Sequence, residues 1–425
     1  MCTIEMSAPA PEPSPFAGGL LRRGMGLLGL RRNVAVLLGM LILAGMGEKL
    51  YQRFLPKYLV ALGGGPLAVG LFGFLDNALG ALYALPGGRL TDRLGHRRAL
   101  ILFASMNLIG CALLALPYWP TVLVAMLFCS AWSQLSLPAT FSLVAAELPP
   151  TKRVMGLAVQ AIIRRVPMAL GPVAGGAIFH IVGIRAGMLW AVAAAAILTL
   201  AAVLLQAWLS RPESKPENLA PQPGISALWR SFCPQLRLML LSDIFIRFCE
   251  QIPNAFVILW VTERLGRSDF EFGLLTAIEM ATAAALYVPV ALWADSRVRA
   301  AQGTSAVAAV MERRPFVIAT FMFFTAFPVA LYYAAGWWSL VAAFVVRGLK
   351  EFGEPTRKAM IVDLAGDGVK ASTVGLYYMI RDLTVSVAAL AGYRLWVVSP
   401  DLNLWSAFAC GVTGTIMYWV LSRRV

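Results

Sequence analysis

The stretch Gly87–Arg98, GGRLTDRLGHRR, decides the fold, because it separates two apolar runs that are each long enough to cross a lipid bilayer. A polar stretch between two such runs is expected to be a short loop at a membrane surface. Its four arginines predict that this surface is the cytoplasmic one, since Lys and Arg concentrate in cytoplasmic loops. The stretch therefore places the chain in a membrane and sets the direction of the neighbouring spans.

The composition of the whole chain also indicates an integral membrane protein. Of its 425 residues 59% are hydrophobic and 14% are charged, and the mean hydropathy is +0.72. A soluble globular domain carries far more charge. Dividing the apolar runs at turn and charge signals predicts twelve spans of roughly 20 residues. Their approximate limits are 34–60, 66–87, 99–117, 121–147, 154–180, 187–209, 237–262, 270–293, 315–335, 338–354, 373–398 and 402–421.

The net charge of +14 follows the topology of the chain. With the N-terminus inside, most Lys and Arg residues fall on the cytoplasmic side, whereas Lys57, Arg185, Arg264 and Arg267 fall on the other. This asymmetry satisfies the positive-inside rule, so the basic balance does not indicate a nucleic-acid partner. We predict a protein of the cytoplasmic (inner) membrane with both termini in the cytoplasm.

The chain divides into two related halves. Aligning Pro355 with Pro138, with a two-residue gap, matches the surrounding segments and indicates an internal repeat. Between the halves the sequence becomes polar and rich in Pro, as expected for a linker. We therefore predict an all-α membrane protein of twelve transmembrane helices in two pseudo-symmetric six-helix bundles. The predicted parts are a basic, disordered tail (1–32), an N-terminal bundle (33–209), a cytoplasmic linker (210–236), a C-terminal bundle (237–421) and a cytoplasmic end (422–425).

The order of residues in the opening stretch resembles that of the major facilitator superfamily of secondary transporters, with the pattern G-x-x-x-D-R-x-G-x-R-R. In that family the loop joins helices 2 and 3. The resemblance implies the major facilitator fold, with a substrate site near the midplane between the halves. We expect this cluster to act as a latch between the halves; the alternative is a basic loop that only fixes topology. The gating residues predicted here are Gly88, Asp92, Arg93, Gly95, Arg97 and Arg98.

A second pattern lies in the fifth span, where Gly171, Pro172, Gly175 and Gly176 match the G-P-x-x-G-G motif associated with proton-coupled antiporters of the same superfamily. Pro172 is expected to bend the helix, and the glycines to permit close packing, so these four are further gating candidates. The alternative is a small-residue packing face. The resemblance favours export, but residues 123–138 lack the arginine that the family usually places in helix 4, which argues against a proton route like that of the drug exporters.

Ionisable side chains recur in the middle of the predicted spans, where each is costly unless it is paired or faces water. The bases slightly outnumber the acids. This balance favours a substrate with an anionic or zwitterionic group, because guanidinium groups bind carboxylate or phosphate bidentately. The candidates for holding such a substrate are Arg164, Arg247, Arg347 and Arg381.

Three mid-span acids are the candidate proton carriers, namely Asp76, Glu250 and Glu279. Each lacks an adjacent base in the sequence, so burial could raise its pKa toward neutrality. Glu48 lies beside Lys49 and is less suited to this role; that pair could instead brace the bundle. Further along the tenth span, Lys350, Glu351 and Glu354 are candidates for an inner gate.

Together these features predict a secondary active transporter, coupled to protons, that moves a small anionic or zwitterionic solute by alternating access, with export favoured. One alternative is an importer or facilitator of an anionic metabolite or a metal chelate. Another is a transporter-like sensor or scaffold without turnover. The expected partners are a small-molecule substrate, protons and the lipid bilayer, and the expected state is a monomer.

An enzyme is the least favoured function. The two histidines, His96 and His180, form no metal or nucleophile constellation with other residues in the sequence. The six cysteines show no paired spacing, so they indicate neither a disulfide framework nor a metal motif. We expect no cofactor and no metal.

Overall fold

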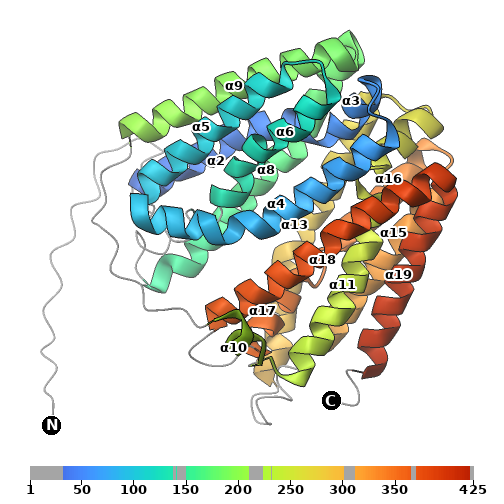
Figure 1. Ribbon diagram of the computed structural model, residues 1–425. Helices are drawn as coiled ribbons and strands as arrows, with labels where there is room; N and C mark the ends of the chain where they lie inside the picture. Colours follow the sequence, from blue (N-terminus) through green and yellow to red (C-terminus); the bar gives the residue numbers. More distant parts are fainter. Residues whose placement is uncertain are drawn as a thin grey trace, which may run out of the picture.

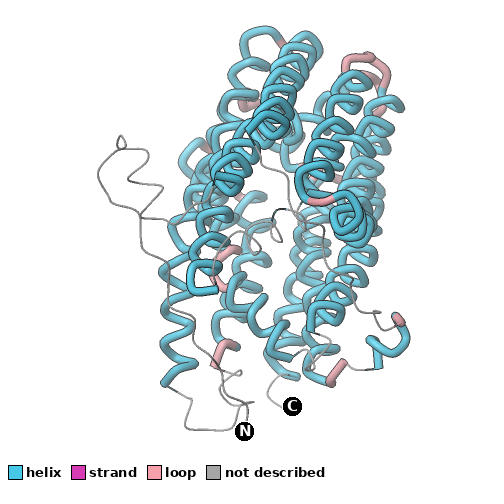
Figure 2. The backbone as a smooth tube through the Cα atoms, turned by 90° about the vertical axis from the view of Figure 1, so that its left-hand side faces the viewer, coloured by secondary structure: helices cyan, strands magenta, loops and turns pink. Residues whose placement is uncertain are grey.

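The computed structural model describes residues 32–136, 140, 150–209, 224–230, 232–300, 312–364 and 370–421. These residues form helices joined by short turns, and no strand occurs among them. Figure 1 shows two groups of inclined helices side by side, the first from α2 to α9 and the second from α11 to α19. Figure 2 shows the helices in a perpendicular view. The predicted fold of two helical bundles is confirmed.

The first bundle covers the first six predicted spans. Its first span is interrupted, and part of its fourth span lies outside the described residues, as do the predicted tail up to residue 31 and most of the linker. The elements are α2 (Arg32–Tyr51), η1 (Gln52–Phe54), α3 (Leu55–Ala61), α4 (Gly65–Leu94), α5 (His96–Leu114), α6 (Trp119–Ser130), the π-helical segment η2 (Ala131–Leu135), α8 (Pro150–Val182) and α9 (Ile184–Leu209).

The second bundle follows a short helix, α10 (Ile225–Arg230), at the end of the linker. Its first and fourth spans are interrupted, and the end of the chain from residue 422 lies outside the described residues. The elements are α11 (Pro234–Asn254), α12 (Val257–Leu259), the π-helical segment η3 (Trp260–Arg264), α13 (Asp269–Ala300), α15 (Arg314–Tyr332), α16 (Trp337–Leu349), α17 (Glu354–Leu364), α18 (Lys370–Val398) and α19 (Pro400–Leu421).

By length and composition alone, 6 helices in the described part of the chain are apolar enough to cross a membrane. A bent pair, residues 234–254 with 257–264, makes a further candidate. Other predicted spans are broken or carry charges, as in the first span, where a 3-10 turn separates α2 from α3.

The stretch Gly87–Arg98 is not the loop that the sequence suggested. Helix α4 continues to Leu94 and α5 begins at His96, so that only Gly95 lies between them. Gly95 has a φ of 78°, a conformation that favours glycine. The arginines mark where the chain leaves the apolar layer, but Arg and Leu are good helix formers and do not end the helix.

The bundles share one hydrophobic core at one end of the molecule and have separate cores at the other. We call the end that carries Gly95 the inner end, because the charge distribution predicts it to be cytoplasmic, and the end that carries Gly183 the outer end. The shared core joins Phe54 and Phe179 of the first bundle to Phe272 of the second, with ring centroids 4.6 and 5.7 Å from Phe54. Toward the inner end each bundle has its own cluster of buried residues. The two bundles are therefore closed against each other at the outer end.

Helices of the two bundles also approach closely on both sides of this shared core. On one side, α4 meets α18, where a Cβ at Gly70 would lie 2.5 Å from Cβ of Tyr393 and one at Gly73 would lie 2.9 Å from Cβ of Ala389. On the other side, α8 meets α13. Small residues let these backbones come together, as is usual for helices in membranes.

Candidate functional site

A cavity of about 230 Å³ lies between the two bundles, near the middle of the molecule. The segments that line it come from α2, η1, α3, α4 and α8 of the first bundle and from α11, α12, α13 and α16 of the second. Part of its wall is apolar, with Phe72, Ile258 and Phe272. The charged residues that line it are Lys49, Arg53, Asp76, Glu250, Arg347 and Lys350.

The break in the first span places polar side chains in this cavity. Pro56 has no N–H to donate to the carbonyl of Gln52, and its ring would crowd that carbonyl in a continuous helix. The chain therefore forms the short 3-10 turn η1 before α3 begins. Lys49, Gln52 and Arg53 then face the cavity, whereas Phe54 is fully buried in the shared core.

Among the described residues, Arg53 and Asp76 are the two charged residues of the cavity lining without a close partner. Both side chains are half-buried. Within the described ranges, no hydrogen bond or ion pair joins either of them to another residue, although Arg53 and Lys49 are close enough to act electrostatically on the Asp76 carboxylate. A guanidinium and a carboxylate are thus available to a solute that enters the cavity.

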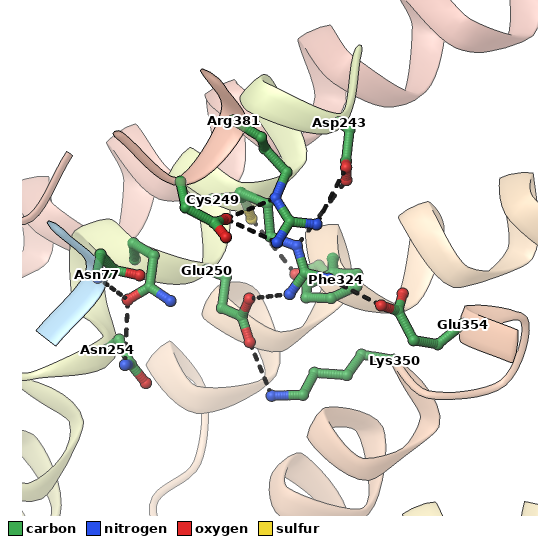
Figure 3. A network of polar contacts seen from close by, with 12 residues as sticks. Asn77, Asp243, Cys249, Glu250, Asn254, Phe324, Lys350, Glu354 and Arg381 are labelled. Atoms are coloured by element: carbon green, nitrogen blue, oxygen red, sulfur yellow. Dashed lines mark hydrogen bonds and ion pairs between the residues drawn. The ribbon is translucent and has the colours of Figure 1, made fainter. Parts of the chain in front are cut away.

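Among the other charges of the cavity, Lys49 on α2 is paired with Glu48 at 3.0 Å, whereas Glu250, Arg347 and Lys350 are held in a network on the second bundle, part of which is drawn in Figure 3. Lys350 Nζ lies 2.9 Å from Glu250 Oε1 and 3.1 Å from Glu279 Oε1. Arg347 lies 3.4 Å from Glu279 and donates a hydrogen bond of 2.8 Å to Asn254. Glu279 is completely buried, so its two cations offset a charge that would be costly alone.

The network continues behind the cavity toward the inner end. Arg247 binds Glu250 at 2.7 Å and Glu354 at 3.1 Å. Glu354 in turn accepts hydrogen bonds of 2.6 and 2.9 Å from Arg357, whose other terminal nitrogen binds Asp243. Arg357 and Asp243 are each 1% exposed. This inner part therefore braces the second bundle and does not face the cavity.

Among the described residues, two ion pairs connect the bundles, one on each side of the cavity. At the outer end Lys57 Nζ lies 2.5 Å from Asp269 Oδ1, which is on the first residue of α13. Toward the inner end Arg165 on α8 lies 3.1 Å from Glu351, which follows α16. The structure thus holds the bundles together by charge on both sides of the cavity.

The glycines of the fifth span pack against the first span. A Cβ at Gly171 would lie 2.5 Å from Cβ of Lys49, and one at Gly175 would overlap the carbonyl oxygen of Leu50. No side chain fits at either position without moving α2. The close contact lies directly before the break that presents Lys49 and Arg53 to the cavity.

The same motif also faces the other bundle. A Cβ at Gly176 would lie 2.5 Å from the carbonyl oxygen of Asp269, and Gly273 packs directly on the carbonyl of Pro172. Pro172 lies inside the long helix α8 and lines the cavity. The motif therefore sits where α8, α2 and α13 converge, beside both the cavity and the outer ion pair.

The first bundle and the start of the second match a known protein family in sequence. The family model described as Major Facilitator Superfamily matches residues 37–249, half of the chain. The chain belongs to the Major Facilitator Superfamily. This membership indicates a secondary transporter in a membrane rather than an enzyme. Comparison with curated proteins finds no match.

Solved structures of transporters share the fold of this superfamily member. A POT family transporter in complex with a thioalcohol conjugated peptide is 15% identical, with a TM-score of 0.71 over 92% of this chain and 95% of that one. A point mutant of the nucleoside transporter NupG is 12% identical, with a TM-score of 0.72 over 91% and 99%. The human organic anion transporter MFSD10 (TETRAN) is 18% identical, with a TM-score of 0.58 over 91% and 99%. At these identities the likeness shows the fold alone.

The four arginines predicted to hold the substrate lie in different surroundings. Arg347 lines the cavity. Arg247 is held by Glu250 and Glu354 and lies over the ring of Phe324, outside the cavity lining. Arg381 binds Asp382 at 2.6 Å and Asp243 at 3.4 Å, in the buried network. Arg164 is half-buried and does not belong to the cavity lining.

The three predicted proton carriers also differ. Asp76 lines the cavity without a close partner among the described residues. Glu250 lines it too, but Lys350 and Arg247 hold its two oxygens. Glu279 lies behind the cavity lining, against Lys350 and Arg347. Arg247 lies three residues before Glu250 on α11, whereas Lys350 and Arg347 come from a segment far away in the sequence.

Of the gating residues predicted around Gly95, Arg97 donates a hydrogen bond to the carbonyl of Ala207, near the end of α9, where the helix dipole favours a positive charge. Arg93 and Arg98 are exposed. The surroundings of Gly88 and the side chain of Asp92 lie outside the described residues. At the neighbouring Gly87, a Cβ would lie 2.6 Å from the carbonyl oxygen of Leu135.

The sequence prediction did not select Arg53, Lys57 or Asp269 as site residues. Arg53 could have been found from Pro56, because a proline three residues after a mid-span arginine predicts a break that exposes it. Lys57 was assigned to the outer side and Asp269 was not considered, because their pairing depends on how the two bundles meet.

Proposed function

We propose that this superfamily member is a proton-coupled transporter that carries a small anionic or zwitterionic solute through the cavity by alternating access. The observation that carries the proposal is the guanidinium of Arg53, unpaired among the described residues, in a cavity lined by four bases and two acids. A guanidinium can bind a carboxylate or phosphate through two parallel hydrogen bonds. Since no described residue occupies Arg53, an anionic solute supplies its partner.

The pairing of the cavity charges supports the anionic class of substrate. Lys49 is paired with Glu48 at 3.0 Å, Arg347 with Glu279 and Lys350 with Glu250, which leaves Arg53 as the lining base that no ion pair engages among the described residues. Proteins of similar fold have compatible ligands, since POT transporters are known in complex with 5-aminolevulinic acid and with sulfate, and MFSD10 is an organic anion transporter. The apolar wall at Phe72 and Phe272 accommodates a hydrophobic group on the solute.

Asp76 is the proposed proton carrier. It faces the cavity without a close partner in the described ranges, so that gaining a proton breaks no ion pair. Glu250 and Glu279 would each have to leave two bases before a proton could bind. The solute anion at Arg53 and the proton at Asp76 would then share one small cavity, which couples their binding electrostatically.

Alternating access would proceed by rocking of the two bundles, residues 33–209 and 237–421, about the cavity. The outer pair Lys57–Asp269 and the inner pair Arg165–Glu351 would break in alternation. The Gly171–Gly176 motif adjoins the moving contacts of α8 with α13, and its resemblance to antiporters favours export from the cytoplasm.

The proposal is tested with purified protein in liposomes that contain a pH-sensitive dye. Small anionic and zwitterionic solutes are screened for solute-dependent proton flux. Asp76→Asn should lose this flux and retain exchange of labelled solute, whereas Arg53→Gln should lose both; the control Asp401→Asn removes an outer acid that is bound to Arg264 at 2.7 Å and should change neither. Undiminished proton flux in Asp76→Asn would refute the coupling. Export further predicts that cells without the protein accumulate more of the solute.

A further inference from the structure

The tenth span is interrupted at residues 350–353, between α16 and α17. The cause is local. Pro355 has no N–H to donate to the carbonyl of Glu351, and a residue before proline disfavours the helical conformation. The chain instead forms tight turns, with hydrogen bonds of 3.2 Å from Glu351 N–H to Gly348 O and 2.9 Å from Phe352 N–H to Leu349 O.

Glycines fix this interruption at both ends. A Cβ at Gly348 would lie 2.6 Å from the carbonyl oxygen of Glu279 on α13, and Gly353 packs on the carbonyl of Phe316 on α15. The Gly353 N–H also donates a hydrogen bond of 2.6 Å to Thr320 Oγ1. The turns between the two glycines are thus packed against two helices. A displacement of one residue in these turns therefore also displaces its neighbours.

Three charged residues in and directly after the interruption bind three different parts of the molecule. Lys350 lines the cavity and binds Glu250 and Glu279. Glu351 binds Arg165 of the other bundle at 3.1 Å. Glu354, the first residue of α17, binds Arg247 and Arg357 in the buried network. One short segment therefore connects the cavity, the inner contact between the bundles and the core of the second bundle.

Lys350 can leave its partners without stranding a buried charge. When it moves away, Glu250 keeps Arg247 at 2.7 Å and Glu279 keeps Arg347 at 3.4 Å. An isolated buried carboxylate would cost several kcal/mol, and this arrangement avoids that cost. Lys350 also has a flexible side chain, unlike Arg347, which is 3% exposed and lies over the rings of Phe327 and Phe344.

We propose that Lys350 is a second anion ligand of the cavity and that the interruption at residues 350–353 couples its capture to opening of the inner end. An anion bound at Arg53 draws Lys350 away from Glu250 and Glu279. The turns then shift between the fixed glycines, and Glu351, the next residue, separates from Arg165. This inference rests on the proposed anionic substrate, because a cation would leave Lys350 in place.

The test measures hydrogen–deuterium exchange of the purified full-length protein in sodium sulfate and in sodium chloride of equal ionic strength. Sulfate should increase exchange in the peptides that contain Arg165 and Glu351. In Lys350→Gln, sulfate should bind about tenfold more weakly, equivalent to about 1.4 kcal/mol, and at saturation should no longer change exchange in these peptides. Glu351→Gln should show the raised exchange without sulfate.

Two further variants keep the result interpretable. Lys350→Arg preserves the charge and should respond to sulfate like the unchanged protein. A response in Lys350→Arg would show that the loss in Lys350→Gln is due to the missing charge. Lys358→Gln removes an exposed lysine from α17 and should respond like the unchanged protein. A full response in Lys350→Gln, or sulfate binding without a response in the unchanged protein, would overturn the coupling. Absence of sulfate binding in the unchanged protein would instead refute the anion cavity on which the inference rests.

Discussion

Lys57 and Asp269 join the two bundles at the outer end through an ion pair of 2.5 Å. Their side chains are 22% and 9% exposed, so water screens this pair less than it would a surface pair. Asp269 is also the first residue of α13, where the helix dipole favours a negative charge. Directly behind it, Gly176 packs on the carbonyl of the same residue. Asp269 therefore holds the two bundles together at the outer end through both its side chain and its backbone.

Breaking this pair should loosen the outer closure. Lys57→Gln and Asp269→Asn should each increase deuterium uptake in peptides from α3 and the start of α13. The exchanged pair Lys57→Asp with Asp269→Lys should recover part of the protection, with a coupling energy of about 1–3 kcal/mol in a double-mutant cycle. The control Arg264→Gln breaks a pair of 2.7 Å within the second bundle and should leave α3 unchanged. Equal exchange in α3 for all variants would show that the pair does not hold the bundles together.

The contact between Gly175 and Leu50 should tolerate no side chain. Gly175→Ala places a methyl group on the Leu50 carbonyl, so α2 and α8 must separate beside the cavity. We expect a loss of stability of about 1–3 kcal/mol, seen as a lower melting temperature of the purified protein. Gly375→Ala on α18 is the matched control, because no atom lies within 4 Å of its added methyl group. Equal melting temperatures for the two variants would contradict the close contact.

Removing one charge from the buried network of the second bundle should lower the stability of the protein more than removing a base and its acid together. Arg357→Gln leaves Asp243 and Glu354 buried with fewer cations, at a cost of about 3–5 kcal/mol. Replacing Arg357 and Asp243 together by Met and Leu should recover part of this stability. Thermal unfolding of both variants beside Lys358→Gln, whose lysine side chain is 51% exposed, checks the expectation. An Arg357→Gln protein as stable as the Lys358→Gln protein would show that the network is not a brace.

The spans and the duplicated fold were accessible from the sequence, because apolar length and the positive-inside asymmetry depend on local composition. The sequence predicted a loop around Gly95, whereas the structure has a one-residue turn there. Charged residues indicate a membrane surface, but they do not determine the backbone conformation. Asp76 and Arg347, which were selected by their mid-span position, line the cavity, whereas Arg164, Arg247 and Arg381, selected in the same way, do not.

The ion pairs between distant segments could not be predicted from the sequence. Glu250 and Glu279 have no adjacent base in the sequence, yet Lys350 reaches both because α11, α13 and α16 meet at one place. Arg53 remains without a close partner in the described part of the chain for the opposite reason, since the break before Pro56 turns it into the cavity. Which arginine is free and which is held depends on the bundle geometry.

The most direct test of the account is the affinity of the purified protein for an anion with and without Arg53. Isothermal titration calorimetry with sodium sulfate, or with a solute that drives proton flux, compares the unchanged protein with Arg53→Gln and with Lys358→Gln, which removes an exposed lysine from α17. The account predicts that Arg53→Gln binds at least about tenfold more weakly while Lys358→Gln binds normally. Equal affinity in Arg53→Gln would contradict the claim that this cavity is built to hold an anion.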